Sequence, residues 1–220
     1  MTEAKSEPNH DAAGDELAAS HVSGNSATHR LAERVIDTRV IHRGHYLEFR
    51  VLTIERADGT TTQRDIVGHP GAVAIVALDP DERLLFVRQY RLAAGAALLE
   101  LPAGTLDVDA ATGEVEPPDV AAARELEEET GYRAGRLERL SDFWTAPGFA
   151  TELMTLYLAT DLRPADEGDR LGADEDEVLE LERLTLDEAL AAVDSGEIRD
   201  AKSIVGVLRL ARLKDRGSRA

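Results

Sequence analysis

Three glutamates at helical spacing are the residues of this sequence whose types and positions could do chemistry. Glu125, Glu128 and Glu129 lie in the segment RELEEETGY, residues 124–132. In an α-helix, residues at positions i, i+3 and i+4 share one face, so the three carboxylates would lie together and repel each other. A divalent cation offsets such repulsion, and Mg²⁺ prefers carboxylate oxygens. A metal-bound water can then act as a nucleophile, while the cation draws charge from phosphoryl oxygens.

An acidic helix face can also be a solvated surface, and three glutamates alone do not exclude that interpretation. The context favours the metal site, because the acidic run follows a glycine-containing loop, is preceded by Arg124 and ends at Gly131. The histidines His42, His45 and His69 do not have a spacing typical of metal ligands. Neither a Ser-His-Asp set nor a GxxxxGK[ST] loop is visible, so the acidic segment is the main candidate for chemistry.

The elements that must position the glutamates can be predicted from the flanking sequence. Pro117-Pro118-Asp119 is typical of a helix start and Gly131 of a helix end, so we expect a helix over residues 120–130. Residues 105–118 should form a turn-rich loop, and residues 163–177 an acidic loop. Apolar runs predict strands over residues 72–78, 83–90, 98–101, 137–144, 153–159 and 178–184, and further helices over 186–193 and 201–213.

The order of these elements indicates an α/β fold. Strands and helices mixed in this way favour a sandwich with a mixed sheet over a doubly wound βαβ fold. Residues 31–67 alternate apolar and polar positions around an Asp58-Gly59 turn, which predicts a small N-terminal antiparallel β lobe. Residues 1–28 lack periodicity and are expected to be a disordered acidic tail. We expect Trp144 in the core.

The composition limits the class of protein. A chain of 220 residues, 43% hydrophobic and 31% charged, can form one domain of ordinary size. Its net charge of -18 disfavours nucleic acid and anionic membranes as partners. The lack of cysteine excludes disulfides, thiolate zinc sites and a cysteine nucleophile. Since no apolar run has the length of a membrane span and the N-terminus has no signal pattern, we expect a cytoplasmic protein.

The acidic segment resembles the Nudix box, whose pattern is Gly, five residues, Glu, seven residues, then Arg-Glu-apolar-any-Glu-Glu-any-Gly-apolar. Seven residues separate Glu116 from Arg124, so Glu116 fits the first glutamate and is expected to form an ion pair with Arg124. Gly104 fits the opening glycine, but eleven residues separate it from Glu116, which predicts a loop insertion and leaves Glu114 as an alternative. The second half of the pattern is matched by Arg124, Glu125, Leu126, Glu128, Glu129, Gly131 and Tyr132.

The resemblance implies roles for the residues of this motif. Glu125 and Glu129 would be the main ligands of two or three Mg²⁺ or Mn²⁺ ions, and Glu128 would assist or order water. The backbone carbonyl of Ala103 would be a further ligand. The structural positions of the motif are Gly104, Glu116, Arg124 and Gly131.

The stretches LPAG, RELEEETG and TAPGF together resemble the ADP-ribose pyrophosphatase branch of the Nudix hydrolase family, over about residues 35–213. In that branch a loop after the box supplies a further carboxylate as general base or ligand. Here the loop is ADEDE, residues 173–177, with Glu177 as the first candidate and Glu175 as the second. The resemblance places Arg64 and Arg91 where related enzymes bind the substrate, although each arginine could instead form a surface salt bridge. Phe49 could stack on adenine or pack in the core. The implied substrate contacts are Arg64, Arg91, Glu152 and Tyr46.

This branch also implies a fold, a reaction and an assembly. The expected fold is a Nudix-type α/β/α sandwich with a mixed sheet over residues 68–215, preceded by the β lobe, residues 29–67, which would mediate a homodimer. The expected reaction is hydrolysis of ADP-ribose to AMP and ribose 5-phosphate. One alternative is hydrolysis of another nucleoside diphosphate sugar or a dinucleotide. Another is a non-catalytic, nucleotide-sensing Nudix module, against which the intact glutamates argue.

Overall fold

The computed structural model describes residues 31–165, 171 and 178–217. The expected tail over residues 1–28 lies outside this range, and so do Glu175 and Glu177. In the described ranges, no helix combines the length and the apolar character needed to span a membrane. The described residues therefore contain the β lobe, the acidic helix and the sheets around it.

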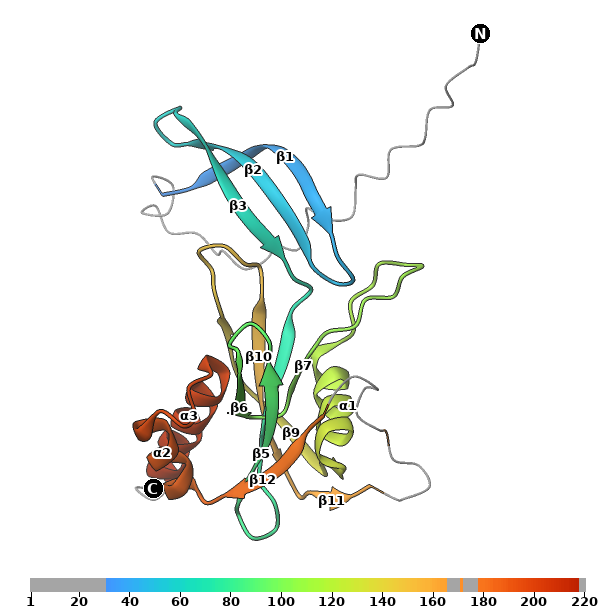
Figure 1. Ribbon diagram of the computed structural model, residues 1–220, viewed down its shortest axis with the longest axis vertical. Helices are drawn as coiled ribbons and strands as arrows, with labels where there is room; N and C mark the ends of the chain where they lie inside the picture. Colours follow the sequence, from blue (N-terminus) through green and yellow to red (C-terminus); the bar gives the residue numbers. More distant parts are fainter. Residues whose placement is uncertain (1–30, 166–170, 172–177, 218–220) are drawn as a thin grey trace.

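The N-terminal lobe is a three-stranded antiparallel sheet of order β1-β2-β3. The predicted turn between β2 and β3 is confirmed. Gly59 has a φ of 80°, which suits glycine, and Asp58 Oδ1 accepts a hydrogen bond from the Thr60 backbone N–H at 2.9 Å. Figure 1 shows the lobe at one end of the molecule, joined to the rest through the end of β3. The strands are β1 (Glu33–Arg43), β2 (Glu48–Arg56) and β3 (Thr61–Gly68).

Two further sheets form most of the body, and β8 and β11 pair separately as a short two-stranded sheet. The first has the order β7-β4-β10-β9 and is mixed, because β4 runs parallel to β10 while the other pairs are antiparallel. The second, of order β12-β5-β6, is antiparallel. The strands are β4 (Ala72–Ala77), β5 (Leu84–Arg91), β6 (Ala96–Glu100), β7 (Ala103–Thr105), β8 (Tyr132–Arg133), β9 (Arg136–Trp144), β10 (Leu153–Thr160), β11 (Arg163–Pro164) and β12 (Glu180–Leu184). The helices are α1 (Pro118–Thr130), α2 (Leu186–Ser195) and α3 (Ala201–Gly217).

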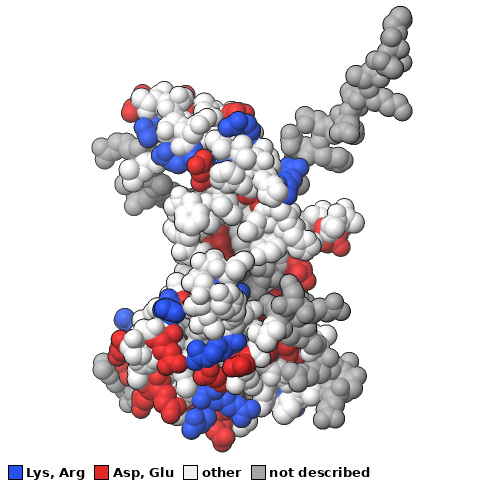
Figure 2. All heavy atoms as spheres, viewed as in Figure 1, with Lys and Arg blue, Asp and Glu red and all other residues white. Residues whose placement is uncertain are grey.

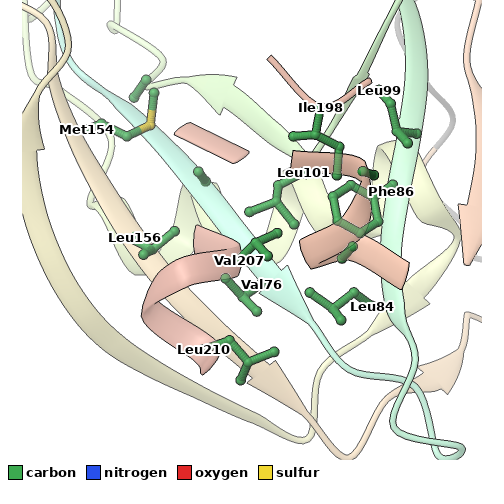
Figure 3. Packing of buried hydrophobic residues seen from close by; sticks show 14 residues of the cluster. Val76, Leu84, Phe86, Leu99, Leu101, Met154, Leu156, Ile198, Val207 and Leu210 are labelled. Atoms are coloured by element: carbon green, nitrogen blue, oxygen red, sulfur yellow. The ribbon is translucent and has the colours of Figure 1, made fainter. Parts of the chain in front are cut away.

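Strand β4 is buried on both faces, which explains its unbroken apolar sequence AVAIVA. Because side chains alternate along a strand, Ala74 and Val76 pack in the cluster that includes Val207 of α3, as Figure 3 shows for Val76 and Val207. Val73 and Ile75 point the other way, into the cluster with α1. Helices therefore cover both sides of the sheet, and the predicted α/β/α sandwich is confirmed (Figure 1).

Helix α1 begins at the predicted prolines and ends at the predicted glycine. Pro118 lies in the first turn, where a missing N–H removes no helical hydrogen bond. Gly131 has a φ of 72° and donates its N–H to the carbonyl of Glu127 at 2.8 Å. The short strands β7, β8 and β11 were not predicted, because two or three residues carry no periodicity that a pattern could detect.

Candidate active site

The acidic face of α1 lies against the short strand β7. A Cβ atom built on Gly104 would lie 1.9 Å from the carboxylate carbon of Glu125, so this carboxylate occupies the space that any other side chain would need. The carboxylate of Glu129, a buried residue, accepts a hydrogen bond from the Ala103 backbone N–H at 3.1 Å. The fold thus brings together four residues that the predicted loop separates in sequence.

Arg124 joins this face to the loop that precedes α1. Its Nε and Nη2 donate to the two carboxylate oxygens of Glu116, at 3.2 and 2.8 Å. These hydrogen bonds are the main cause of the raised pKa of Arg124 and of the lowered pKa of Glu116. The expected ion pair is therefore present, and Glu116 rather than Glu114 makes it.

The same guanidinium lies beside two of the three glutamates. Nη1 of Arg124 donates to Glu125 at 2.8 Å and to Glu128 at 2.9 Å, which offsets part of the repulsion along the helix. In the part of the chain that the structure describes, no three His, Cys, Asp or Glu side chains form a preformed metal cluster. The carboxylates beside the bare backbone of Gly104 nevertheless offer oxygen donors, the chemistry that Mg²⁺ and Mn²⁺ prefer. The donor set fits a divalent cation if the Ala103 carbonyl completes it.

Tyr46 and Glu152, which were expected to contact the nucleoside or the ribose, both lie beside His69. The rings of Tyr46 and His69 lie edge to face with centroids 5.8 Å apart. His69 Nε2 lies 3.5 Å from Glu152 Oε1, and His69 Nδ1 accepts the Gly71 backbone N–H at 3.0 Å. A ring nitrogen that accepts a hydrogen bond is unprotonated, so His69 is neutral with its proton on Nε2. Burial correspondingly lowers the pKa of His69, although Glu152 acts in the opposite direction.

A hollow of about 400 Å³ lies beside Tyr46, at the β1–β2 hairpin. Phe49 lines it and is 37% exposed, so Phe49 is not a core residue. Val67, which lines the hollow, lies near the end of β3, a few residues before β4 begins. Gly104, which lies against Glu125, pairs with Val73 near the start of β4, so the hollow and the acidic face lie toward the same end of this strand. Other lining residues are His42, His45, Leu47 and Val67.

Both arginines expected to bind phosphate form ion pairs. Arg91, the last residue of β5, donates through Nε and Nη2 to Glu100 at 3.0 and 2.8 Å. Arg64 pairs with Glu33 at 2.6 Å, across the sheet of the lobe. Arg91 therefore lies beside the segment that leads from β6 into β7, whereas the ion pair of Arg64 stays within the lobe.

A buried glutamate that was not predicted as a functional residue anchors the end of α1. Glu127 accepts two hydrogen bonds from Arg133, each at 2.7 Å, and one from the Leu171 backbone N–H at 3.0 Å. It thereby ties α1 to the acidic loop at Leu171, and the candidate bases of that loop, Glu175 and Glu177, lie outside the described residues. Glu127 is two positions from both Glu125 and Glu129 and therefore does not belong to the acidic face. This spacing was the one sequence signal for a separate role of Glu127.

The prediction that Trp144 lies in the core is wrong. Its side chain is 53% exposed at the end of β9, where it stands opposite Leu153 of β10. Strand β9 is at the edge of its sheet, and its last residue receives less cover from the rest of the fold than β4 does. A large aromatic residue at such a position is exposed in spite of its hydrophobicity.

A family profile described as NUDIX domain matches residues 68–204. The chain belongs to the NUDIX domain family. The methanol dehydrogenase activator of Bacillus methanolicus is 41% identical over 175 residues, which cover 80% of this chain and 90% of that protein. The ADP-ribose pyrophosphatase of Bacillus subtilis is 38% identical over 177 residues, covering 80% and 91%. The GDP-mannose pyrophosphatase of Cronobacter sakazakii is 33% identical over 174 residues, covering 73% and 86%.

A solved structure described as an ADP compounds hydrolase has the same fold. The TM-score is 0.70, the match covers 86% of this chain and 97% of the other, and the sequences are 22% identical. The predicted Nudix fold and the resemblance to the ADP-ribose pyrophosphatase branch are confirmed, and the chain is a Nudix pyrophosphatase-type enzyme.

Proposed function

We propose that this Nudix enzyme hydrolyses the diphosphate bond of ADP-ribose to AMP and ribose 5-phosphate. The observation that carries the proposal is the contact between α1 and β7. Glu125 lies against Gly104 and Glu129 binds the Ala103 N–H, so two carboxylates face one segment of backbone. The ADP-ribose pyrophosphatase of Bacillus subtilis, which aligns over 80% of the chain, supports the choice of substrate.

The carboxylates and the Ala103 carbonyl would hold Mg²⁺ or Mn²⁺. When bound, such an ion lowers the pKa of its water and offsets negative charge on the phosphoryl oxygens. In the hydrolysis itself, the oxygen of a water molecule would form a bond to one phosphorus as the bridging P–O bond breaks, and a carboxylate of this chain would take the proton. Glu128 is a described candidate for this base, with Glu175 and Glu177 as the others. Two or three ions would be needed to neutralise the diphosphate and the three glutamates together.

The chain's other residues would bind the rest of the substrate. Arg91 presents a guanidinium near the metal-site backbone, where it can donate to phosphate oxygens. Tyr46 offers an aromatic ring beside an open hollow, which suits stacking on adenine. Glu152, oriented by His69 and Thr145, offers a carboxylate that can accept a ribose hydroxyl. Arg64 would serve the phosphates of a neighbouring subunit if the lobe reaches that site.

A panel of nucleotide diphosphates tests this assignment. ADP-ribose, GDP-mannose, UDP-glucose and NADH are each incubated with Mg²⁺ or with chelator, and a phosphatase then releases phosphate from monoester products. Preferential, metal-dependent hydrolysis of ADP-ribose supports the proposal. Preference for GDP-mannose would instead select the second candidate substrate, which the similarity to a GDP-mannose pyrophosphatase favours. Absence of hydrolysis throughout the panel would refute both.

The metal site is tested by one isosteric substitution. Glu129→Gln removes a ligand charge without removing volume, so turnover should fall by at least about 100-fold while the protein stays folded. The matched control is Glu138→Gln, because Glu138 is half exposed on β9 and pairs only with Arg136 among its described ion pairs. Wild-type turnover in Glu129→Gln would contradict the metal assignment.

We also propose that residues 29–67 mediate a homodimer. Strand β1 is exposed along its whole length and forms the edge of its sheet, with unpaired backbone groups that favour association. Its apolar side chains Val35, Ile36, Val40 and Ile41 are 39% to 47% exposed. Figure 2 also shows many uncharged side chains where the lobe meets the body. Sedimentation velocity should give a dimer that Val40→Glu dissociates, while Ala57→Glu, in the exposed β2–β3 turn, leaves it intact.

A further inference from the structure

A buried ionic network lies on the side of the β6–β7 segment away from α1. Glu100, the last residue of β6, is 2% exposed. Its carboxylate binds Arg91 through two hydrogen bonds and also pairs with Lys202 of α3. Lys202 in turn pairs with Asp200 at 3.1 Å. Burial alone raises the pKa of Glu100, but the two cations outweigh it and keep that pKa below its usual value, so Glu100 is anionic.

Helix α3 is fixed to the same segment by a buried serine. The Ser203 hydroxyl is fully buried, accepts the Leu101 backbone N–H at 2.7 Å and hydrogen-bonds to Asp200 Oδ2. Asp200 also accepts the backbone N–H groups of Lys202 and Ser203, at 3.2 and 3.1 Å, and so caps the helix. A Cβ on Gly206 would lie 2.3 Å from Leu101 Cδ1, which shows how closely α3 approaches.

Three elements hold successive backbone groups of the short segment between Glu100 and Gly104. The Leu101 N–H binds Ser203 of α3, and the Pro102 carbonyl accepts the N–H of Ile75 in β4 at 2.8 Å. The Ala103 N–H binds Glu129 of α1 at 3.1 Å. The segment that would present the Ala103 carbonyl is therefore fixed from both sides of the sheet.

We propose that Glu100, Lys202 and Ser203 are positioning residues that set, from the α3 side, the placement of both Arg91 and the Ala103 backbone. The inference rests on the proposed function, since it assigns Ala103 to the metal and Arg91 to phosphate. Glu100 connects the two, because its carboxylate holds Arg91 while its backbone leads within three residues to Ala103. None of the three residues needs to touch substrate or metal.

Each member of the network controls a different part of the site. Without Lys202, Glu100 is a buried anion with Arg91 as its remaining cation in this network, so it holds the Arg91 guanidinium more tightly. Binding of phosphate oxygens by Arg91 then weakens. Without the Ser203 hydroxyl, the buried Leu101 N–H loses its acceptor, and the segment before Ala103 shifts toward other partners. Outer partners of metal ligands typically change affinity by about 10- to 100-fold when removed.

Three variants and a control, all on α3, test the inference. Lys202→Met should raise KM for ADP-ribose about 10-fold, and Lys202→Arg should restore it in part. Ser203→Ala should weaken Mn²⁺ binding about 10-fold, measured without substrate by water-proton relaxation. The control is Lys214→Met, since Lys214 pairs with exposed Glu82. Near-ultraviolet circular dichroism checks folding, and if Lys202→Met does not fold, Ser203→Ala, which removes one oxygen atom, carries the test.

The results separate this inference from the proposed function. If Glu129→Gln weakens Mn²⁺ binding but Ser203→Ala binds Mn²⁺ like the wild type, the metal site stands and the positioning role is overturned. If Glu129→Gln itself binds Mn²⁺ normally, the proposed metal site fails first. Equal KM values in Lys202→Met and Lys214→Met would overturn the link between α3 and Arg91.

Discussion

Replacing Gly104 by alanine adds one methyl group at the point where α1 and β7 meet. The new Cβ would lie 1.9 Å from the carboxylate carbon of Glu125 and 2.4 Å from its Oε2. Ordinary contacts of a Cβ begin near 3.4 Å, so the Glu125 carboxylate must move by about 1.5 Å. Metal–ligand distances tolerate about 0.2 Å, and a misplacement of about 1 Å can cost about 100-fold in rate.

The expected result of Gly104→Ala is a fall of about 100-fold in kcat and weaker Mn²⁺ binding, with little loss of stability. Gly104 is not among the glycines with positive φ, and alanine is compatible with a strand, so the backbone is not strained. The displaced group is the end of a long side chain, which can rotate away. The unfolding free energy should therefore change by less than about 1 kcal/mol.

Steady-state hydrolysis of ADP-ribose, Mn²⁺ titration and urea unfolding measure the three quantities. The matched control is Gly217→Ala, because a Cβ on Gly217 meets no atom within 4 Å. Wild-type kcat in Gly104→Ala would refute the argument that the Glu125 carboxylate must occupy this space. A large loss of stability would refute the claim that the substitution acts on the site alone.

Three further changes probe the residues around the acidic face and the hollow beside Tyr46. Arg124→Met removes charge-assisted hydrogen bonds to Glu116, so urea unfolding should show a loss of about 1.5–3 kcal/mol; an unchanged midpoint would mean that the pair contributes nothing. Tyr46→Ala should raise KM for ADP-ribose about 10-fold with kcat nearly constant, whereas Tyr46→Phe keeps the ring and should resemble the wild type. Because burial lowers the folded-state pKa of His69 below its usual 6.5, the unfolded chain binds the proton more readily. The stability contributed by neutral His69 is thus present above pH 6.5 and is lost as the pH falls through the pKa of His69 in the folded protein. The unfolding free energy of His69→Gln should therefore depend less steeply on pH in this range.

The residues of the acidic helix were predictable because local rules govern them. Proline at the start, glycine at the end and glutamates at helical spacing fix α1 and its acidic face from the sequence alone. The alternation within the lobe and the apolar run of β4 were equally local signals. The choice between Glu116 and Glu114 was not local, because an insertion changed the spacing, and the ion pair with Arg124 decided it.

Contacts between distant segments could not be predicted in the same way. Lys202 follows Glu100 by 102 residues, and only the folded sheet brings α3 against β6. His69 belongs to no recognisable sequence motif. Its position between Tyr46 and Glu152 depends on the connections β1–β2, β3–β4 and β9–β10, which only the fold brings together. The exposure of Trp144 followed from the edge position of β9, which residue type alone does not determine.

The two ends of the loop before α1, at Asp107 and Glu116, lie side by side next to the acidic face. The Glu116 N–H donates to the Asp107 carbonyl at 2.8 Å, and the Asp107 N–H donates to the Glu116 carboxylate at 3.3 Å. Farther out, Val108 pairs with Val115 as an isolated bridge, so the hairpin closes on itself. The chain beyond this closure can lengthen or shorten without moving Gly104 or Arg124, since added loop residues cost little entropy. The tip over residues 109–114 is therefore a natural place to insert a peptide tag or fluorophore that reports on the site while leaving its chemistry intact.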